Sequence, residues 1–173
     1  MSIEETTEAA CARIHVQWHE FTKTKQAEKL IALYAEDATL ETPLVMAILE
    51  DKAEGVLRGR AEIKNFFDEG LRRRPNDLLR GYRTSLYFTD GKILTWEYPR
   101  ETPHGDQIDL IEMIEVETGK IKHHRIYWGW FGFNLLLNNA LGKSTEQCAR
   151  QGGNTLAASV TAPLFEPLEA SGR

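Results

Sequence analysis

The sequence lacks the features that identify several large classes of protein. Its 173 residues include only two cysteines, Cys11 and Cys148, which are too few for a disulfide framework. No apolar run approaches the roughly 20 residues of a membrane-spanning helix, and the acidic N-terminus is unlike a signal peptide. There is no glycine-rich phosphate loop and no internal repeat. We therefore expect a cytoplasmic protein that needs no cofactor and has no membrane partner.

An excess of positive charge is absent as well. The formal net charge is −5, so the chain has no electrostatic footprint for nucleic acid. The three arginines at 72–74 are better explained as the solvated end of a helix than as a phosphate site. Hydrophobic residues make up 42% of the chain and charged residues 27%, which is ordinary for a globular protein of one domain.

Two strand-like runs joined by a turn, at 108–130, carry the most informative pattern. In the first run, Glu112 belongs to a row of alternate residues that are otherwise Ile, Leu or Val. In the second run, His124 belongs to a row that continues with Ile126, Trp128 and Trp130. Each apolar face therefore contains one polar group that can do chemistry.

The turn between the runs decides whether these two groups meet. A three-residue loop with Gly119 in the left-handed conformation would put Glu112 directly opposite His124. Opposed residues have Cβ atoms about 4.5–5.5 Å apart, which allows contact between a carboxylate and an imidazole. A two-residue Thr118-Gly119 turn would put Arg125 opposite Glu112 instead. We favour the first register because it keeps both apolar rows on one face.

The first half of the chain reads as helical. Apolar residues at helical spacing predict helices over 5–21, 26–34 and 60–71. A short strand after the second helix ends at Pro43. Residues 44–58 are interpreted as an irregular lid or loop.

The second half of the chain reads as strands. Asp90-Gly91 predicts a hairpin turn between runs at 82–89 and 92–100, and a short helix at 131–141 is expected to close the fold. Helices first and strands last indicate an α+β protein, with the helices on one face of a curved antiparallel sheet. Such a cone encloses an apolar pocket, a usual place for a ligand.

His15 and His19 lie four residues apart, and so on one face of the first helix. This spacing can hold a metal ion, but the glutamate that zinc proteases place after the first histidine is Val16 here, and no third ligand is near. We predict no metal site and expect both histidines at the surface or rim.

Three strings resemble the nuclear transport factor 2-like superfamily, in its SnoaL-like and ketosteroid-isomerase-like branch. They are LYAEDATLETP at 33–43, LRGRAEIKNFF at 57–67 and IDLIEMIEVETGKIKHHRIYW at 108–128. The resemblance implies a cone-shaped α+β domain over residues 1–143, with a curved antiparallel sheet around about three N-terminal helices and a closing helix. The remainder, 144–173, is expected to be a tail, either poorly ordered or docked on a partner subunit.

The resemblance carries roles over to single residues. Glu112 falls where the isomerases place a protonated acid and where polyketide cyclases place their catalytic acid. Tyr34 matches a tyrosine of the isomerase hydrogen-bond network. Thr42 stands in place of the general-base aspartate, Trp18 in place of the oxyanion tyrosine and Phe67 in place of a supporting tyrosine.

The charged constellation of limonene epoxide hydrolases is also missing, because Glu97 and Ile126 occupy two of its places. The resemblance and the residues together predict a cofactor-free acid–base enzyme that acts next to a carbonyl group of an apolar, cyclic small molecule. Glu112 and His124 are the expected catalytic residues. Ionised Glu112 would abstract a proton and neutral Glu112 would donate a hydrogen bond, with His124 in the complementary role.

The expected substrate-binding residues are Trp18, Tyr34, Thr42, Phe67 and Trp128. Two other outcomes remain open: a non-catalytic protein that binds an apolar ligand or a partner, and a scaffold whose interior is filled by its own side chains.

His123, Arg125 and Tyr127 should point to the opposite face of the sheet. In the fold that the resemblance implies, this face is commonly a dimer interface, and Tyr127 suits one, so a homodimer through it is expected.

Overall fold

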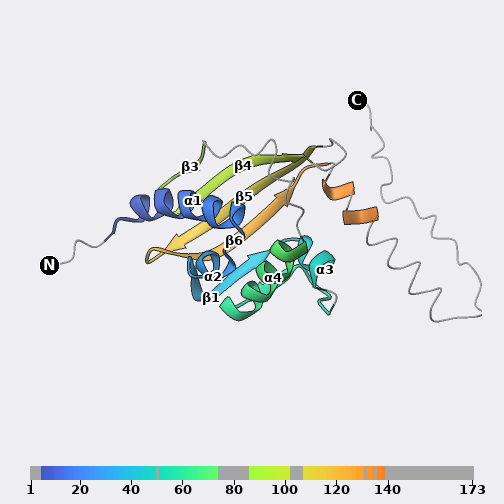
Figure 1. Ribbon diagram of the computed structural model, residues 1–173. Helices are drawn as coiled ribbons and strands as arrows, with labels where there is room; N and C mark the ends of the chain where they lie inside the picture. The colour runs from blue at the N-terminus through green and yellow to red at the C-terminus, as the bar shows by residue number, and fades with distance from the viewer. Residues whose placement is uncertain are drawn as a thin grey trace, which may run out of the picture.

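The computed structural model describes residues 5–49, 51–73, 86–101, 107–130, 132–134 and 136–138, without the side chains of 98–101 and 107–109. It has the expected α+β architecture, with helices against a curved, open sheet (Figure 1). The sheet order is β2-β1-β6-β5-β4-β3. The elements are α1 (Thr7–Lys23), α2 (Ala27–Ile31), β1 (Tyr34–Glu41), α3 (Leu44–Ile48), β2 (Val56–Arg58), α4 (Arg60–Arg73), β3 (Phe88–Thr89), β4 (Ile93–Glu101), β5 (Gln107–Glu117) and β6 (Lys120–Trp128).

One strand pair departs from the expected antiparallel pattern. β1 runs parallel to β6, while the other four pairs of the described sheet are antiparallel. β1 comes long before β6 in the chain, with α4 and four strands between them. Such a long connection allows a parallel pairing, which a two-residue hairpin does not.

Helix α1 lies across β4 and β5, and α4 packs on α2, β1 and β2 (Figure 1). The N-terminus of α1 is capped by Thr6, whose hydroxyl accepts a hydrogen bond from the amide of Ala9 at 3.2 Å. The apolar residues at helical spacing on this helix face inward, with Cys11, Ile14 and Trp18 buried and Phe21 partly buried. Of the helices that the structure describes, none is both long and apolar enough to cross a membrane.

Helix α2 is shorter than predicted because the residues that follow it pair with β6. The predicted helix at 26–34 ends at Ile31, and Tyr34 begins β1. The backbone amide of Ile121 on β6 donates to the carbonyl of Leu33 at 2.9 Å. Sheet pairing therefore overrides the local helical pattern at this point.

Residues 44–58 are more regular than the expected loop. They form α3, which packs on α4, and β2, which pairs antiparallel with β1. Both elements are too short to leave a periodic pattern in the sequence. At Gly55, a Cβ atom would lie 2.8 Å from the carbonyl oxygen of Thr42, so this close approach requires glycine.

The Asp90-Gly91 turn is confirmed. The Asp90 carboxylate accepts from the amides of Lys92 and Ile93 at 2.9 and 2.7 Å, and Gly91 has a φ of 90°. Part of the first predicted strand of this hairpin, 82–85, lies outside the described residues. Of the helix predicted at 131–141, residues 132–134 and 136–138 are described and helical, and the tail at 144–173 lies outside the described residues.

The β5–β6 hairpin has the two-residue turn, so the favoured three-residue loop was wrong. Thr118 and Gly119 both have positive φ, 46° and 73°, and Glu117 pairs with Lys120. This is the geometry of a type I′ turn, whose twist matches that of the flanking strands. By itself, this turn would have turned His124 away from the face that holds Glu112.

A β-bulge at Lys122 corrects the register. Val116 pairs with Ile121 but Glu115 pairs with His123, so Lys122 is one extra residue on β6. Beyond the bulge, Ile126 is opposite Glu112 and His124 is opposite Ile114. Glu112 and His124 therefore share the inner face, as diagonal rather than direct neighbours.

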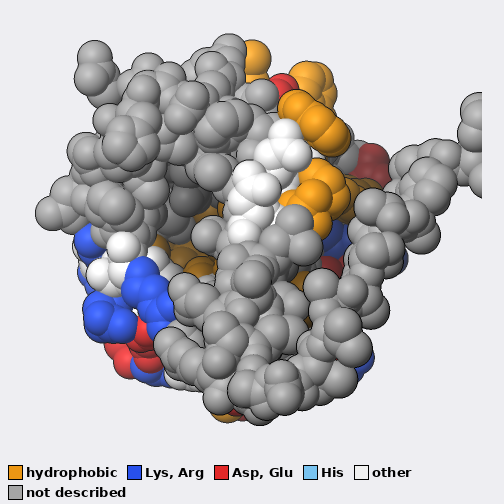
Figure 2. Space-filling model, turned by 90° about the vertical axis from the view of Figure 1, so that its right-hand side faces the viewer, with side chains coloured by type: hydrophobic (Ala, Val, Ile, Leu, Met, Phe, Trp, Pro, Cys, Tyr) orange, Lys and Arg blue, Asp and Glu red, His pale blue; other side chains and the backbone are white. Residues whose placement is uncertain are grey.

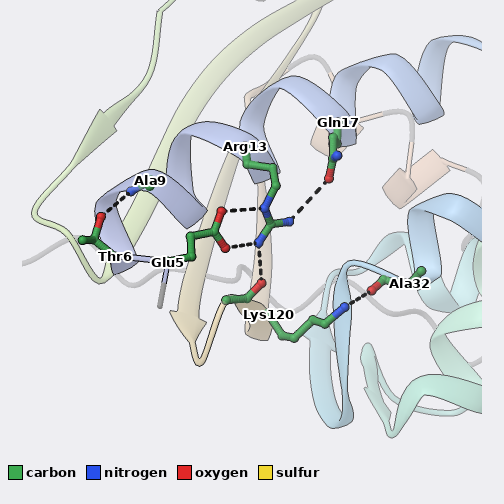
Figure 3. Close-up of polar contacts among 8 residues, drawn as sticks. Glu5, Thr6, Ala9, Arg13, Gln17, Ala32 and Lys120 are labelled. Atoms are coloured by element: carbon green, nitrogen blue, oxygen red, sulfur yellow. Dashed lines mark hydrogen bonds and ion pairs between the residues drawn. The ribbon is translucent and has the colours of Figure 1, made fainter. Parts of the chain in front are cut away.

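Side chains of α1 and β6 fix this hairpin against the helices (Figure 3). Arg13 donates to the carbonyl of Gly119 at 2.8 Å and binds both carboxylate oxygens of Glu5. Lys120 donates to the carbonyl of Ala32, at the end of α2, at 2.7 Å. The turn is thus held between the first two helices, which sets the position of β6 relative to α1.

Replacing Thr118 with asparagine should stabilise the protein. A β-branched residue is strained at positive φ, and Asn-Gly is the preferred type I′ pair. We expect the free energy of unfolding in urea to rise by about 1 kcal/mol. Thr118→Ala is the matched control, because alanine removes the branch but keeps a Cβ at positive φ. An equal effect of both variants would contradict this account of the turn.

Candidate functional site

Glu112 and His124 are in contact at the centre of the sheet. His124 Nε2 is hydrogen-bonded to Glu112 Oε2, and neither side chain has any exposed surface. On β4, Trp96 pairs with Glu112, and on β1, Leu40 pairs with His124. The contact predicted from the two rows is therefore present, although the register that brings it about differs from the favoured one.

Tyr34 contacts the other nitrogen of the same imidazole. Its hydroxyl lies 2.7 Å from His124 Nδ1, and its side chain is fully buried. Burial raises the pKa of Tyr34 well above its ordinary value; a hydrogen bond with the Trp18 side chain lowers this pKa, and the charge of Glu112 raises it further. Tyr34 is therefore a neutral hydroxyl group at neutral pH. The three residues form a continuous chain of hydrogen bonds across β1, β6 and β5.

Aromatic rings enclose this chain. Trp18 meets the His124 ring edge-on, with centroids 6.1 Å apart, and packs on Trp96 at 5.3 Å. Phe67, from α4, packs on Tyr34 at 5.7 Å. The polar groups thus lie in an apolar, water-poor surrounding, where electrostatic interactions are stronger than in water.

Thr42 and Trp128 lie one step further along the same face, near the ends of β1 and β6. The indole nitrogen of Trp128 donates to the Thr42 hydroxyl at 3.0 Å. Thr42 is buried and Trp128 is partly buried. Figure 2 views this end of the molecule and shows hydrophobic side chains reaching its surface. The predicted site residues therefore come from α1, α4 and the strands β1, β5 and β6 or their ends, and all are buried except Trp128, which is partly buried.

The structure corrects the position of two histidines. His15 and His19 are only 5% and 4% exposed, so the expectation that they lie at the surface or rim was wrong. Their rings lie 4.7 Å apart, and both pack on Trp96. The Tyr87 ring packs on His15 in a tilted arrangement, with ring centroids 4.6 Å apart. Their burial depends on these two aromatic residues from the strand half of the chain, which the helix pattern alone does not reveal.

The surroundings of His15 and His19 do not supply the further ligands of a metal site. Within the described ranges, no three His, Cys, Asp or Glu side chains gather as a metal site would need. Burial lowers the pKa of His15 below its ordinary value. His15 is therefore a neutral packing residue between α1 and β4.

The opposite face of the sheet carries charged groups, as predicted. Arg125 lies 3.2 Å from both Glu41 and Glu115, and it contacts His123 at 2.8 Å. Tyr127 is half exposed on the same face. A homodimer through this face stays a prediction.

The SnoaL-like domain family matches residues 15–124, which is well over half of the chain. The chain belongs to this family. The matched range includes Glu112 and His124, and the family is part of the nuclear transport factor 2-like superfamily. A comparison with curated protein sequences finds no match.

Solved structures with the same fold agree with this assignment. A SnoaL-like protein of unknown function from Burkholderia thailandensis has a TM-score of 0.57 at 13% identity, over 73% of this chain and 99% of its own. An NTF2-like protein of unknown function from Mesorhizobium loti has a TM-score of 0.55 at 16% identity, over 70% and 93%. A candidate ketosteroid isomerase from Kribbella flavida has a TM-score of 0.53 at 17% identity, over 72% and 81%. Identities this low show the fold alone.

Acid should weaken the protein through His15. Its pKa is lower in the folded chain than in the unfolded chain, which takes up a proton first as the pH falls below about 6.5. The stabilisation is thus complete above that pH and is lost as the pH falls toward the folded pKa. His15→Phe keeps the contacts with Trp96 and Tyr87 but cannot take up a proton. We expect its free energy of unfolding in urea to fall less than that of the wild type between about pH 7 and 5. An unchanged slope in this variant would contradict the assignment.

Proposed function

We propose that the protein is a cofactor-free acid–base enzyme that moves a proton next to a carbonyl group of an apolar, cyclic small molecule. The proposal is carried by the hydrogen-bonded contact of Glu112 with His124 inside an apolar shell. A buried pair of this kind is a poor source of stability, because the cost of removing both groups from water can exceed their attraction. The presence of such a pair therefore favours a chemical role.

The chemistry needs one group that accepts a proton and one that supports the resulting charge. Removal of a proton from the carbon beside a carbonyl group leaves an enolate, and return of the proton to another carbon isomerises the molecule. If the enolate loses a neighbouring hydroxyl group, the result is dehydration. If the enolate attacks a second carbonyl group of the same molecule, the result is cyclisation. Acid–base catalysis of this type contributes about 10²–10⁴-fold in rate.

The surroundings of the pair support an apolar substrate. Trp18 and Phe67 supply aromatic surface around the pair, and Trp128 and Thr42 follow toward the end of the sheet. A ring system fits flat aromatic walls, and one hydroxyl group provides a single polar contact. Among similar folds, one structure carries the name of a candidate ketosteroid isomerase.

A non-catalytic ligand-binding protein is the second candidate. It is favoured by the complete burial of Glu112 and His124, which leaves neither side chain any solvent-accessible surface. In such a protein the pair would shape the interior, and its removal would change affinity and stability only.

Exchange of substrate hydrogen for deuterium distinguishes the two candidates. We expect the wild-type protein in D₂O to introduce deuterium beside the carbonyl group of at least one compound in a panel of cyclic ketones and enones, as followed by mass spectrometry. Glu112→Gln should reduce this rate by about 10²–10⁴-fold, because glutamine cannot take up the proton. Glu115→Gln is the matched control, since it lies on the same strand but faces outward; its rate should equal that of the wild type.

Two results would reject catalysis. One is a Glu112→Gln protein that exchanges hydrogen as fast as the wild type. The other is a panel in which compounds bind, as shown by a rise in the melting temperature, but none is deuterated, isomerised, dehydrated or cyclised. The second result would establish the ligand-binding candidate.

A further inference from the structure

Tyr34, His124 and Glu112 form a hydrogen-bonded chain in which both ring nitrogens of His124 have a partner. Each member comes from a different strand, and all three side chains are fully buried. An imidazole has two nitrogens, and here both are engaged, Nδ1 by Tyr34 and Nε2 by Glu112. The direction of one hydrogen bond therefore sets the direction of the other.

The Tyr34 hydroxyl carries one proton, which must be donated to an acceptor. His124 Nδ1 is the acceptor that the described residues supply. The Trp18 side chain cannot serve as a second acceptor for this proton, because an indole N–H only donates. If Nδ1 carried a hydrogen and donated to Tyr34, the buried hydroxyl proton would be left without this acceptor, which is costly. Tyr34 therefore donates, and Nδ1 is unprotonated.

The rest of the chain follows from this direction. A neutral imidazole with an unprotonated Nδ1 carries its hydrogen on Nε2. Nε2–H then donates to Glu112 Oε2, so this oxygen acts as an acceptor. An ionised carboxylate can only accept hydrogen bonds, which fits this direction. Of the two roles that the sequence leaves open for Glu112, this arrangement favours the ionised one.

We propose that Tyr34 is a positioning residue that holds His124 as the neutral Nε2–H tautomer and so presents Glu112 as the proton-abstracting base. The catalytic part of this inference rests on the proposed function, whereas the tautomer does not. In the reaction, the C–H bond beside the carbonyl group breaks and its proton goes to a Glu112 carboxylate oxygen. The electron pair moves to the carbonyl oxygen to form the enolate, and Glu112 later returns the proton to carbon. His124 keeps its proton throughout and stabilises the carboxylate.

The tautomer is measured without any substrate. Protein labelled with ¹⁵N in its histidines gives a long-range ¹H–¹⁵N spectrum in which protonated and unprotonated ring nitrogens have separate shifts. His124→Asn identifies the His124 signals among the five histidines by their loss. We expect an unprotonated Nδ1 and a protonated Nε2 in the wild type at neutral pH. A protonated Nδ1, alone or together with Nε2, would overturn the proposal, and this wild-type result stands even if a variant fails to fold.

Tyr34→Phe tests the cause of the tautomer. It removes one oxygen and keeps the ring that packs on Phe67. We expect the Nδ1 signal to move toward the protonated shift, because Nδ1 has lost its donor. Tyr127→Phe is the control, since it removes a hydroxyl group from the outer face of the same sheet, and its His124 signals should match the wild type. Unchanged His124 signals in Tyr34→Phe would overturn the positioning role.

Kinetics separate this proposal from the proposed function. With a ketone that the wild type deuterates, Tyr34→Phe should lower kcat about five- to tenfold and leave KM unchanged, as loss of one supporting hydrogen bond implies. A rise in KM alone would make Tyr34 a substrate contact and overturn the positioning role. If no ketone is deuterated or converted, the proposed function fails, and the spectrum still decides the tautomer.

Discussion

The hydrogen bond between Glu112 and His124 is the constraint on which the rest of the structure depends. Two polar groups without exposed surface must satisfy each other, because an unpaired buried charge is far more costly than a paired one. Their strands must therefore pair in a register that points both side chains inward. Tyr34 must also reach Nδ1, which requires β1 to lie beside β6. The parallel pairing of these two strands thus completes the polar chain as well as the sheet.

The Lys122 bulge reconciles this requirement with a tight turn. A type I′ turn suits the twist of the hairpin but gives a register in which His124 would face outward. One extra residue shifts every later residue of β6 by one position and restores the inward row. Arg13 and Lys120 hold the same turn against the helices. The bulge thus moves the catalytic candidate from one face of the sheet to the other, although Lys122 itself takes no part in the site.

The rows of the hairpin could be predicted from the sequence because strand alternation is a local property. Glu112 and His124 are polar members of apolar rows whatever the length of the turn. Their contact is therefore predicted correctly even though the predicted loop is wrong. The bulge could not be predicted, because Lys122 resembles any exposed strand residue and its extra position exists only relative to β5. The burial of His15 likewise depends on Tyr87 and Trp96, which are distant in sequence. Elements as short as α3 and β2 leave no period to detect.

Complete burial leaves the polar chain to define its own proton positions. A solvated histidine exchanges tautomers freely, whereas an imidazole with a hydroxyl donor on one side and a carboxylate on the other has one favoured arrangement. The dry aromatic shell strengthens these hydrogen bonds and removes water that would compete for the Glu112 carboxylate. A base of this kind needs only the substrate carbon to reach it. Among the predicted site residues, Trp128 has more than a few per cent of its surface exposed, and it is hydrogen-bonded to Thr42 further along the same face.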